Sequence, residues 1–259
     1  MKLHIVPARQ GIQWVKQGMQ TFFRQPMALS GLFFMFLAVM SLFSLVPLVG
    51  NIVAMTLLPG ATLGLMAATR EAGDGKFPMP TILLSAFRAG RKELRAMLLL
   101  GALYVAGLVA VLAASALIDG GKFAKLYLIG GPMTAELLQE SDFQSAMIFA
   151  TALYMPISLL FWHAPALVHW HGVPPVKSLF FSLIACLRNF AAFTVYSFAW
   201  VGIFIVVGML VAIVATMLGS AQLVATLMYP FAMIMAAMFF TSIYFTFRDN
   251  FEISPGEKI

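Results

Sequence analysis

The chain has 259 residues, of which 61% are hydrophobic and only 10% are charged. Soluble domains carry about a quarter charged residues, so this composition excludes an ordinary water-soluble domain. A helix that crosses a membrane needs about 20 mostly apolar residues, and the chain contains several such segments. A transmembrane barrel would show short alternating segments instead. The composition therefore predicts membrane-spanning helices.

Residues 8–25 are predicted to form an amphipathic helix. Ile12, Val15, Met19 and Phe22 fall on one face, and basic and amide side chains fall on the other. With Trp14 nearby, this basic pattern favours a helix that lies in the membrane interface. A soluble cap that packs on the membrane helices is the alternative.

Six apolar segments follow, and their interiors contain no Asp, Glu, Lys or Arg. Prolines interrupt three of them and predict kinks at Pro59, Pro156, Pro165 and Pro230. The predicted spans are residues 27–49, 52–69, 96–118, 144–168, 190–218 and 221–247. Carriers coupled to ions or protons usually place an ionisable group near mid-membrane, so coupled transport is disfavoured.

Two further amphipathic helices are predicted over residues 81–95 and 174–189. Each surface helix, including the first, precedes an outward and an inward span. This order suggests a threefold repeat, and either transporter ancestry or a duplicated packing arrangement explains it. Residues 119–143 are predicted as a long polar loop and residues 248–259 as a polar tail. We thus predict a single integral membrane domain, an all-α polytopic protein with six transmembrane helices and three interfacial helices.

Charge placement predicts the orientation of this layout. If both termini are cytoplasmic, 14 of the 16 basic residues lie on the inner side, and only Lys122 and Lys125 lie outside. Basic residues beside span ends favour the cytoplasmic side, so the three surface helices face the cytoplasm and the 119–143 loop is periplasmic. Topology and anionic lipid explain the surplus of basic residues, so no nucleic-acid partner is expected.

The histidines of the fourth span and the turn after it are the clustered candidates for metal ligands. His163, His169 and His171 are separated by six and two residues. Helical metal sites place two ligands four residues apart so that both point the same way, and this spacing does not. Trp162 and Trp170 favour an interfacial belt instead. We expect no metal site and no cofactor.

Catalytic motifs are missing from the sequence. It contains no Gly-rich phosphate loop, no nucleophile elbow and no zinc-protease His-Glu motif. Ser178 and Ser182 lie near His171, but no acidic residue is available to orient a base, so a polar helix face is the better interpretation. We expect a protein without enzymatic activity and without catalytic residues.

Two stretches carry a family resemblance. They are Phe161-Trp-His-Ala-Pro-Ala-Leu-Val-His-Trp-His-Gly172 with Ala185-Cys-Leu-Arg-Asn189, and Gly11-Ile-Gln-Trp-Val-Lys-Gln-Gly18 with Phe22-Phe-Arg-Gln-Pro26. Over almost the whole chain, the sequence resembles the BPSS-type family of bacterial membrane proteins, which implies a multi-pass protein of the inner membrane. More distantly, it is similar to the membrane domain that precedes glycerophosphoryl diester phosphodiesterases. The catalytic domain of those enzymes is missing, so the resemblance implies no activity.

The functional hypothesis rests on the basic inner face. We expect it to contact the phospholipid bilayer, anionic lipids above all, with a membrane-protein partner or a second copy of the chain as other candidates. The predicted headgroup contacts are Arg24, Arg88, Arg91, Lys92, Arg95, Lys177 and Arg188. The alternative is a passive or weakly coupled transporter of a small or amphipathic solute, which uses the proline-containing second, fourth and sixth spans.

Overall fold

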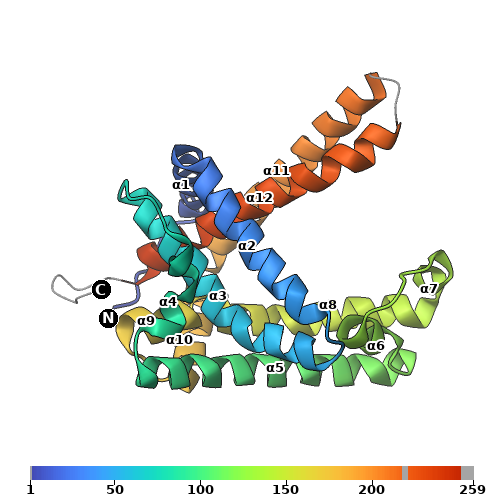
Figure 1. Cartoon of the computed structure of the whole chain (residues 1–259), viewed down its shortest axis with the longest axis horizontal. Coiled ribbons are helices and arrows are strands. Elements are labelled where there is room, and N and C mark those ends of the chain that lie inside the picture. Colours follow the sequence, from blue (N-terminus) through green and yellow to red (C-terminus); the bar gives the residue numbers. More distant parts are fainter. Residues whose placement is uncertain (1, 218–220, 252–259) are drawn as a thin grey trace. The chain divides into compact units, whose positions relative to one another are not determined.

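The computed structural model describes residues 2–217 and 221–251. In these ranges the regular structure is helical (Figure 1), apart from an isolated β-bridge between Leu3 and Phe251. The elements in chain order are α1 (Gln10–Arg24), α2 (Pro26–Ser44), α3 (Val49–Gly73), a 3-10 turn (Pro80–Leu84), α4 (Ser85–Arg88), α5 (Arg91–Asp119), α6 (Lys122–Ile129), α7 (Ala135–Gln139), α8 (Ser141–Trp162), α9 (Ala164–His171), α10 (Pro175–Arg188), α11 (Phe190–Met217) and α12 (Ala221–Asn250).

Six helical segments of the described chain are long and apolar enough to cross a membrane. They are Pro26–Ser44, Val49–Gly73, Arg91–Asp119, Ser141–His171, Phe190–Met217 and Thr226–Asn250. An α-helix satisfies its backbone hydrogen bonds internally, which the hydrocarbon interior requires of any segment that crosses it. The predicted fold class, an all-α polytopic membrane protein with six spans, is confirmed.

Several of these helices extend beyond the predicted apolar segments. α5 begins at Arg91, so Arg91, Lys92 and Arg95 lie in the first turns of a membrane-capable helix. α3 continues to Gly73 and carries Arg70 in its last turn. Charged side chains at such positions reach the headgroup region, so a spanning helix can include them at its ends.

The four prolines differ in their positions. Pro59 lies inside α3, Pro156 inside α8 and Pro230 inside α12. Pro165 instead stands in the first turn of α9. A proline there costs no helical hydrogen bond, because the first N–H groups of a helix have no intrahelical acceptor. The predicted fourth span is therefore two consecutive helices, α8 and α9, that meet at His163.

The prediction of one continuous amphipathic helix over residues 81–95 is wrong. A 3-10 turn leads into the single turn of α4, and α5 starts anew at Arg91. The break falls at Gly90, whose φ of +135° is rarely adopted by residues with a side chain. The hydrophobic pattern continues across this glycine and so does not reveal the break. The threefold repeat, which needed this helix, remains a prediction.

The chain divides into two compact units. The first unit comprises Met1–Phe34, Gly64–Leu83 and Ala185–Ile259, and the second comprises Met35–Leu63 and Leu84–Ile184. α2 and α3 each contribute residues to both units. The two units are described separately below.

In the first unit, α1 packs across the beginning of α11 and the end of α12. Its buried residues are Gly11, Trp14, Val15, Gly18, Thr21 and Phe22. A Cβ atom at Gly18 would lie 2.4 Å from the Cβ of Ser242, and one at Gly11 would lie 2.3 Å from the Ala192 carbonyl oxygen. The glycines thus let α1 approach both helices closely. Ile12, predicted on the apolar face, is 55% exposed.

The second unit has an apolar core between α3, α5 and α8. Tyr104, Leu108 and Leu112 of α5 are buried there, and side chains of α3, α6 and α8 pack around them. The hydroxyl groups of Tyr104 and Tyr154 lie 2.8 Å apart and share a hydrogen bond. This hydrogen bond gives each phenol hydroxyl a partner, which offsets the free-energy cost of removing the hydroxyls from water.

Candidate functional site

Three arginines from the ends of three helices line a polar hollow in the first unit. Arg24, Arg70 and Arg248 stand in the last turns of α1, α3 and α12. The hollow has a volume of about 310 Å³. Its other polar lining residues are Gln17, Gln20, Thr21, Asp74 and Tyr244. The lining of this hollow therefore contains three cations and one carboxylate.

Arg248 is held in place by its neighbours. Its Nη2 donates to the Oε1 of Gln17 at 3.1 Å, and its Nε donates to the Oδ1 of Asp249 at 2.8 Å. The guanidinium carbon lies 4.9 Å from the centre of the Phe245 ring, within the range of a cation–π contact. These contacts fix the side chain and leave its Nη1 hydrogens available to a ligand.

Asp249 also joins α1 to α12. Its Oδ2 accepts hydrogen bonds from Gln10 Nε2 at 2.7 Å and from Trp14 Nε1 at 3.0 Å. Trp14 is fully buried, and a buried indole N–H needs an acceptor. The prediction of α1 as an interfacial helix did not anticipate this burial. The helix is anchored to the membrane helices on one face and exposed on the other.

The other two arginines of the hollow are less constrained. Arg24 is exposed, and its Nη1 lies 3.5 Å from the Gly73 carbonyl oxygen. Within residues 2–217 and 221–251, no hydrogen bond or ion pair involves the Arg70 side chain. A cation in the last turn of a helix offsets the negative end of the helix dipole, which is the simplest role for each arginine alone. That role does not explain why the three arginines converge on one hollow.

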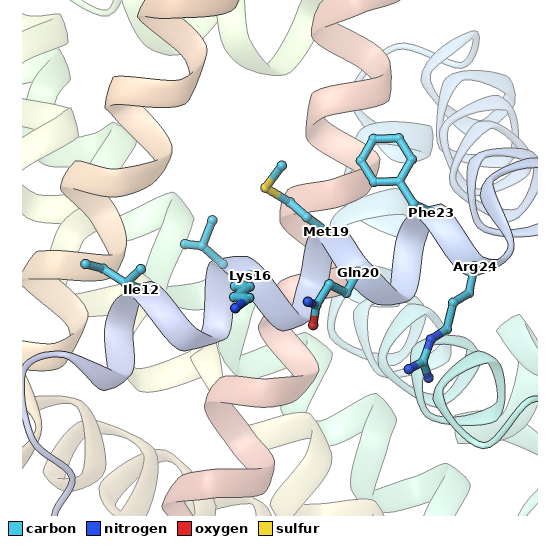
Figure 2. A pocket seen from close by; sticks show the side chains of 7 residues that line it. Ile12, Lys16, Met19, Gln20, Phe23 and Arg24 are labelled. Atoms are coloured by element: carbon cyan, nitrogen blue, oxygen red, sulfur yellow. The ribbon is translucent and has the colours of Figure 1, made fainter.

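A second hollow runs along α1 beside the first. This groove has a volume of about 680 Å³ and is lined by Ile12, Val15, Lys16, Met19, Gln20, Phe23 and Arg24. Figure 2 shows Ile12, Met19 and Phe23 along one edge of the helix, with Gln20 and Arg24 on the other. The groove and the arginine hollow share Gln20 and Arg24. An apolar surface thus adjoins a cationic one on a single helix.

The cations predicted to contact lipid come from both units. Arg24 and Arg188 belong to the first unit, whereas Arg88, Arg91, Lys92, Arg95 and Lys177 belong to the second. All seven are exposed. Only Arg24 lines the arginine hollow. Sequence reasoning missed Arg70 and Arg248 as site residues, although both are cations at the predicted inner ends of spans, which was the available signal.

The histidine-rich stretch forms a helix junction. Ser182 Oγ donates to the Leu159 carbonyl oxygen at 2.7 Å and accepts the His163 N–H at 2.9 Å. In an uninterrupted helix these two backbone groups would bond to each other. The serine hydroxyl therefore stands between α8 and α9 and satisfies both groups. In the described ranges, no three His, Cys, Asp or Glu side chains converge on a point where a metal ion could bind.

Six membrane-capable helices and a cationic hollow at three helix ends define an integral, multi-pass α-helical membrane protein. Over 99% of its length, the chain is 40% identical to "Probable inner membrane protein BTH_II0599" of Burkholderia thailandensis, and the match covers 96% of that protein. The chain therefore belongs to the same family of inner membrane proteins. No protein-family model matches the sequence, and no solved structure matches it.

Proposed function

We propose that the protein is a non-enzymatic component of the inner membrane that binds anionic phospholipid through its basic face. The supporting observation is that the seven predicted cations, named above, are exposed at or near the ends of helices. Within the described residues, none of the seven forms an ion pair. Each cation near an anionic leaflet contributes about 1 kcal/mol to lipid attraction, so several together hold lipid measurably.

The proposal is tested on the cluster around the start of α5. Replacement of Arg88, Arg91, Lys92 and Arg95 by Gln removes four exposed cations from this region. We expect the variant to retain less phosphatidylglycerol than the wild type when both are released from detergent in native mass spectrometry.

The matched control replaces Lys122 and Lys125 by Gln. These two cations lie in the loop predicted to be periplasmic, so this variant should keep the wild-type lipid. Equal retention by the quadruple variant and the wild type would refute the role of the α5 cluster.

The transporter alternative has less support. It needs a polar path along the proline-containing helices, whereas the second unit has Tyr104, Leu108 and Leu112 packed between α3, α5 and α8. The distant resemblance to the membrane domain of glycerophosphoryl diester phosphodiesterases remains a hypothesis about ancestry. A membrane-protein partner and a second copy of the chain remain candidates for the same basic face.

A further inference from the structure

We propose that the arginine hollow and the adjoining groove on α1 form a discrete site for one anionic glycerophospholipid. The phosphate would lie among Arg24, Arg70 and Arg248, and an acyl chain would lie along Ile12, Met19 and Phe23. This inference rests on the proposed function, because it names a specific site for the anionic lipid.

Charge complementarity supports an anionic headgroup. The hollow presents three guanidinium groups and one lining carboxylate, that of Asp74. A second carboxylate, on Asp249, is already engaged by Arg248, Gln10 and Trp14. Guanidinium groups donate paired hydrogen bonds to phosphate oxygens, and such charge-assisted bonds are stronger than neutral ones. A phosphate would therefore meet donors with unused N–H groups on Arg70 and Arg248.

The hollow is partly organised before any ligand arrives. Gln17, Asp249 and Phe245 already hold Arg248, and Tyr244 and Phe245, which are buried, form part of the wall. A side chain that is fixed in advance loses little conformational entropy on binding. The volume of about 310 Å³ is at the lower end of small-molecule sites, which suits a compact headgroup.

The groove supports an amphiphile over a soluble anion. Ile12 is 55% exposed and Phe23 is 64% exposed. Both line the groove on α1 (Figure 2), which shares Gln20 and Arg24 with the arginine hollow. Water would penalise this apolar surface, but an acyl chain would cover it. α1 also crosses the ends of α11 and α12, which places it at the level of lipid headgroups in the predicted topology.

The test compares Arg70→Gln with Lys125→Gln in the full-length protein, since Lys125 is an exposed cation outside the predicted headgroup contacts. Phosphatidylglycerol is titrated into delipidated protein in detergent, and the one-lipid complex is measured by native mass spectrometry. We expect wild type and Lys125→Gln to bind the first lipid equally and Arg70→Gln to bind it roughly tenfold more weakly, because one charge-assisted interaction is lost. Arg70 has no hydrogen bond in the described chain, so the variant should fold normally, and its thermal unfolding midpoint checks this.

The remaining arms separate the possible sources of the signal. Phe23→Ser should weaken phosphatidylglycerol but not glycerol 3-phosphate, and phosphatidylcholine should bind less tightly than phosphatidylglycerol. Equal affinity of Arg70→Gln and wild type would overturn the site. If the quadruple α5 variant still loses lipid in that case, the proposed function stands without the site; if it does not, both fail. Displacement of the lipid by glycerol 3-phosphate at equal concentration would identify a soluble anion as the ligand and overturn the lipid assignment.

Discussion

Single residues in this protein replace backbone hydrogen bonds that the helices cannot make. Ser182 is the clearest example, because its buried hydroxyl joins the Leu159 carbonyl to the His163 N–H across the junction of α8 and α9. The sequence pattern predicts Ser182 as part of a polar helix face. A buried serine that substitutes for a missing helical bond has no local sequence signal, because its two partners lie about 20 positions away.

Ser182→Ala should destabilise the protein by about 1–3 kcal/mol, because two backbone groups lose their partner in a buried position. The midpoint of thermal unfolding in detergent is the measurement. Ser158→Ala is the control, since that hydroxyl donates to a carbonyl of its own helix on an exposed surface. If both variants unfold at the same temperature, the helix closes its own hydrogen bond and Ser182 has no bridging role.

At the scale of helices, close approach depends on glycines that hydropathy does not reveal. Gly101 of α5 faces α3, and a Cβ atom there would lie 2.0 Å from the Thr56 carbonyl oxygen. The apolar pattern predicted the six membrane-capable helices, because a helix segment that contacts lipid hydrocarbon must be apolar. It did not show which face of each helix meets a neighbour, and on α1 the packing face centres on Gly11 and Gly18.

Gly101→Ala should lower stability by about 1–3 kcal/mol, because the added methyl group forces α3 and α5 apart. Gly202→Ala is the matched control, since no atom lies within 4 Å of a Cβ built there. Alanine favours helix over glycine by about 1 kcal/mol, so the control should be unchanged or slightly more stable. Thermal unfolding in one detergent checks both variants, and equal midpoints would contradict the tight contact.

The hydrophobic pattern also did not predict where some helices end or which helix ends converge. Gly90 breaks the predicted helix of residues 81–95, and the arginines of the hollow come from three elements far apart in sequence. Of those three arginines, only Arg24 is predicted from the sequence as a site residue. Convergence of helix ends depends on long-range packing, and no spacing along the chain encodes it. The sequence shows that cations gather at the inner ends of the spans. It does not show which of these cations lie close together in the fold.

For the whole molecule, orientation in the membrane is the property that the charge distribution predicts. Arg24, Arg70 and Arg248 all lie on the side predicted to be cytoplasmic, whereas Lys122 and Lys125 lie in the loop predicted to be periplasmic. The chain has a single cysteine, Cys186, which is buried. Cysteines introduced at exposed positions can therefore report this orientation. Burial raises the pKa of Cys186 to about 12. At about pH 7.5, well below that pKa, we expect the buried thiol to stay protonated and to react slowly with maleimides.

New cysteines at exposed positions should therefore report the topology without removal of Cys186. Lys125→Cys should react with a membrane-impermeant maleimide added to intact spheroplasts. Lys76→Cys should react only after the membrane is permeabilised. Wild-type protein is the blank, and it should be labelled only after unfolding in detergent. The reverse pattern at the two sites would overturn the six-span orientation.

The attachment of α1 has a consequence for biosynthesis. Gln10 and Trp14 bond to Asp249, which lies more than 230 residues later in the chain. A nascent polypeptide emerges amino end first, so α1 leaves the ribosome long before the helix that receives it. Until α11 and α12 are inserted, Trp14, Gly11 and Gly18 of α1 have no helix to pack against. We expect α1 to lie on the membrane surface until then, and a chain truncated before α11 should leave the packing face of α1 accessible to proteases.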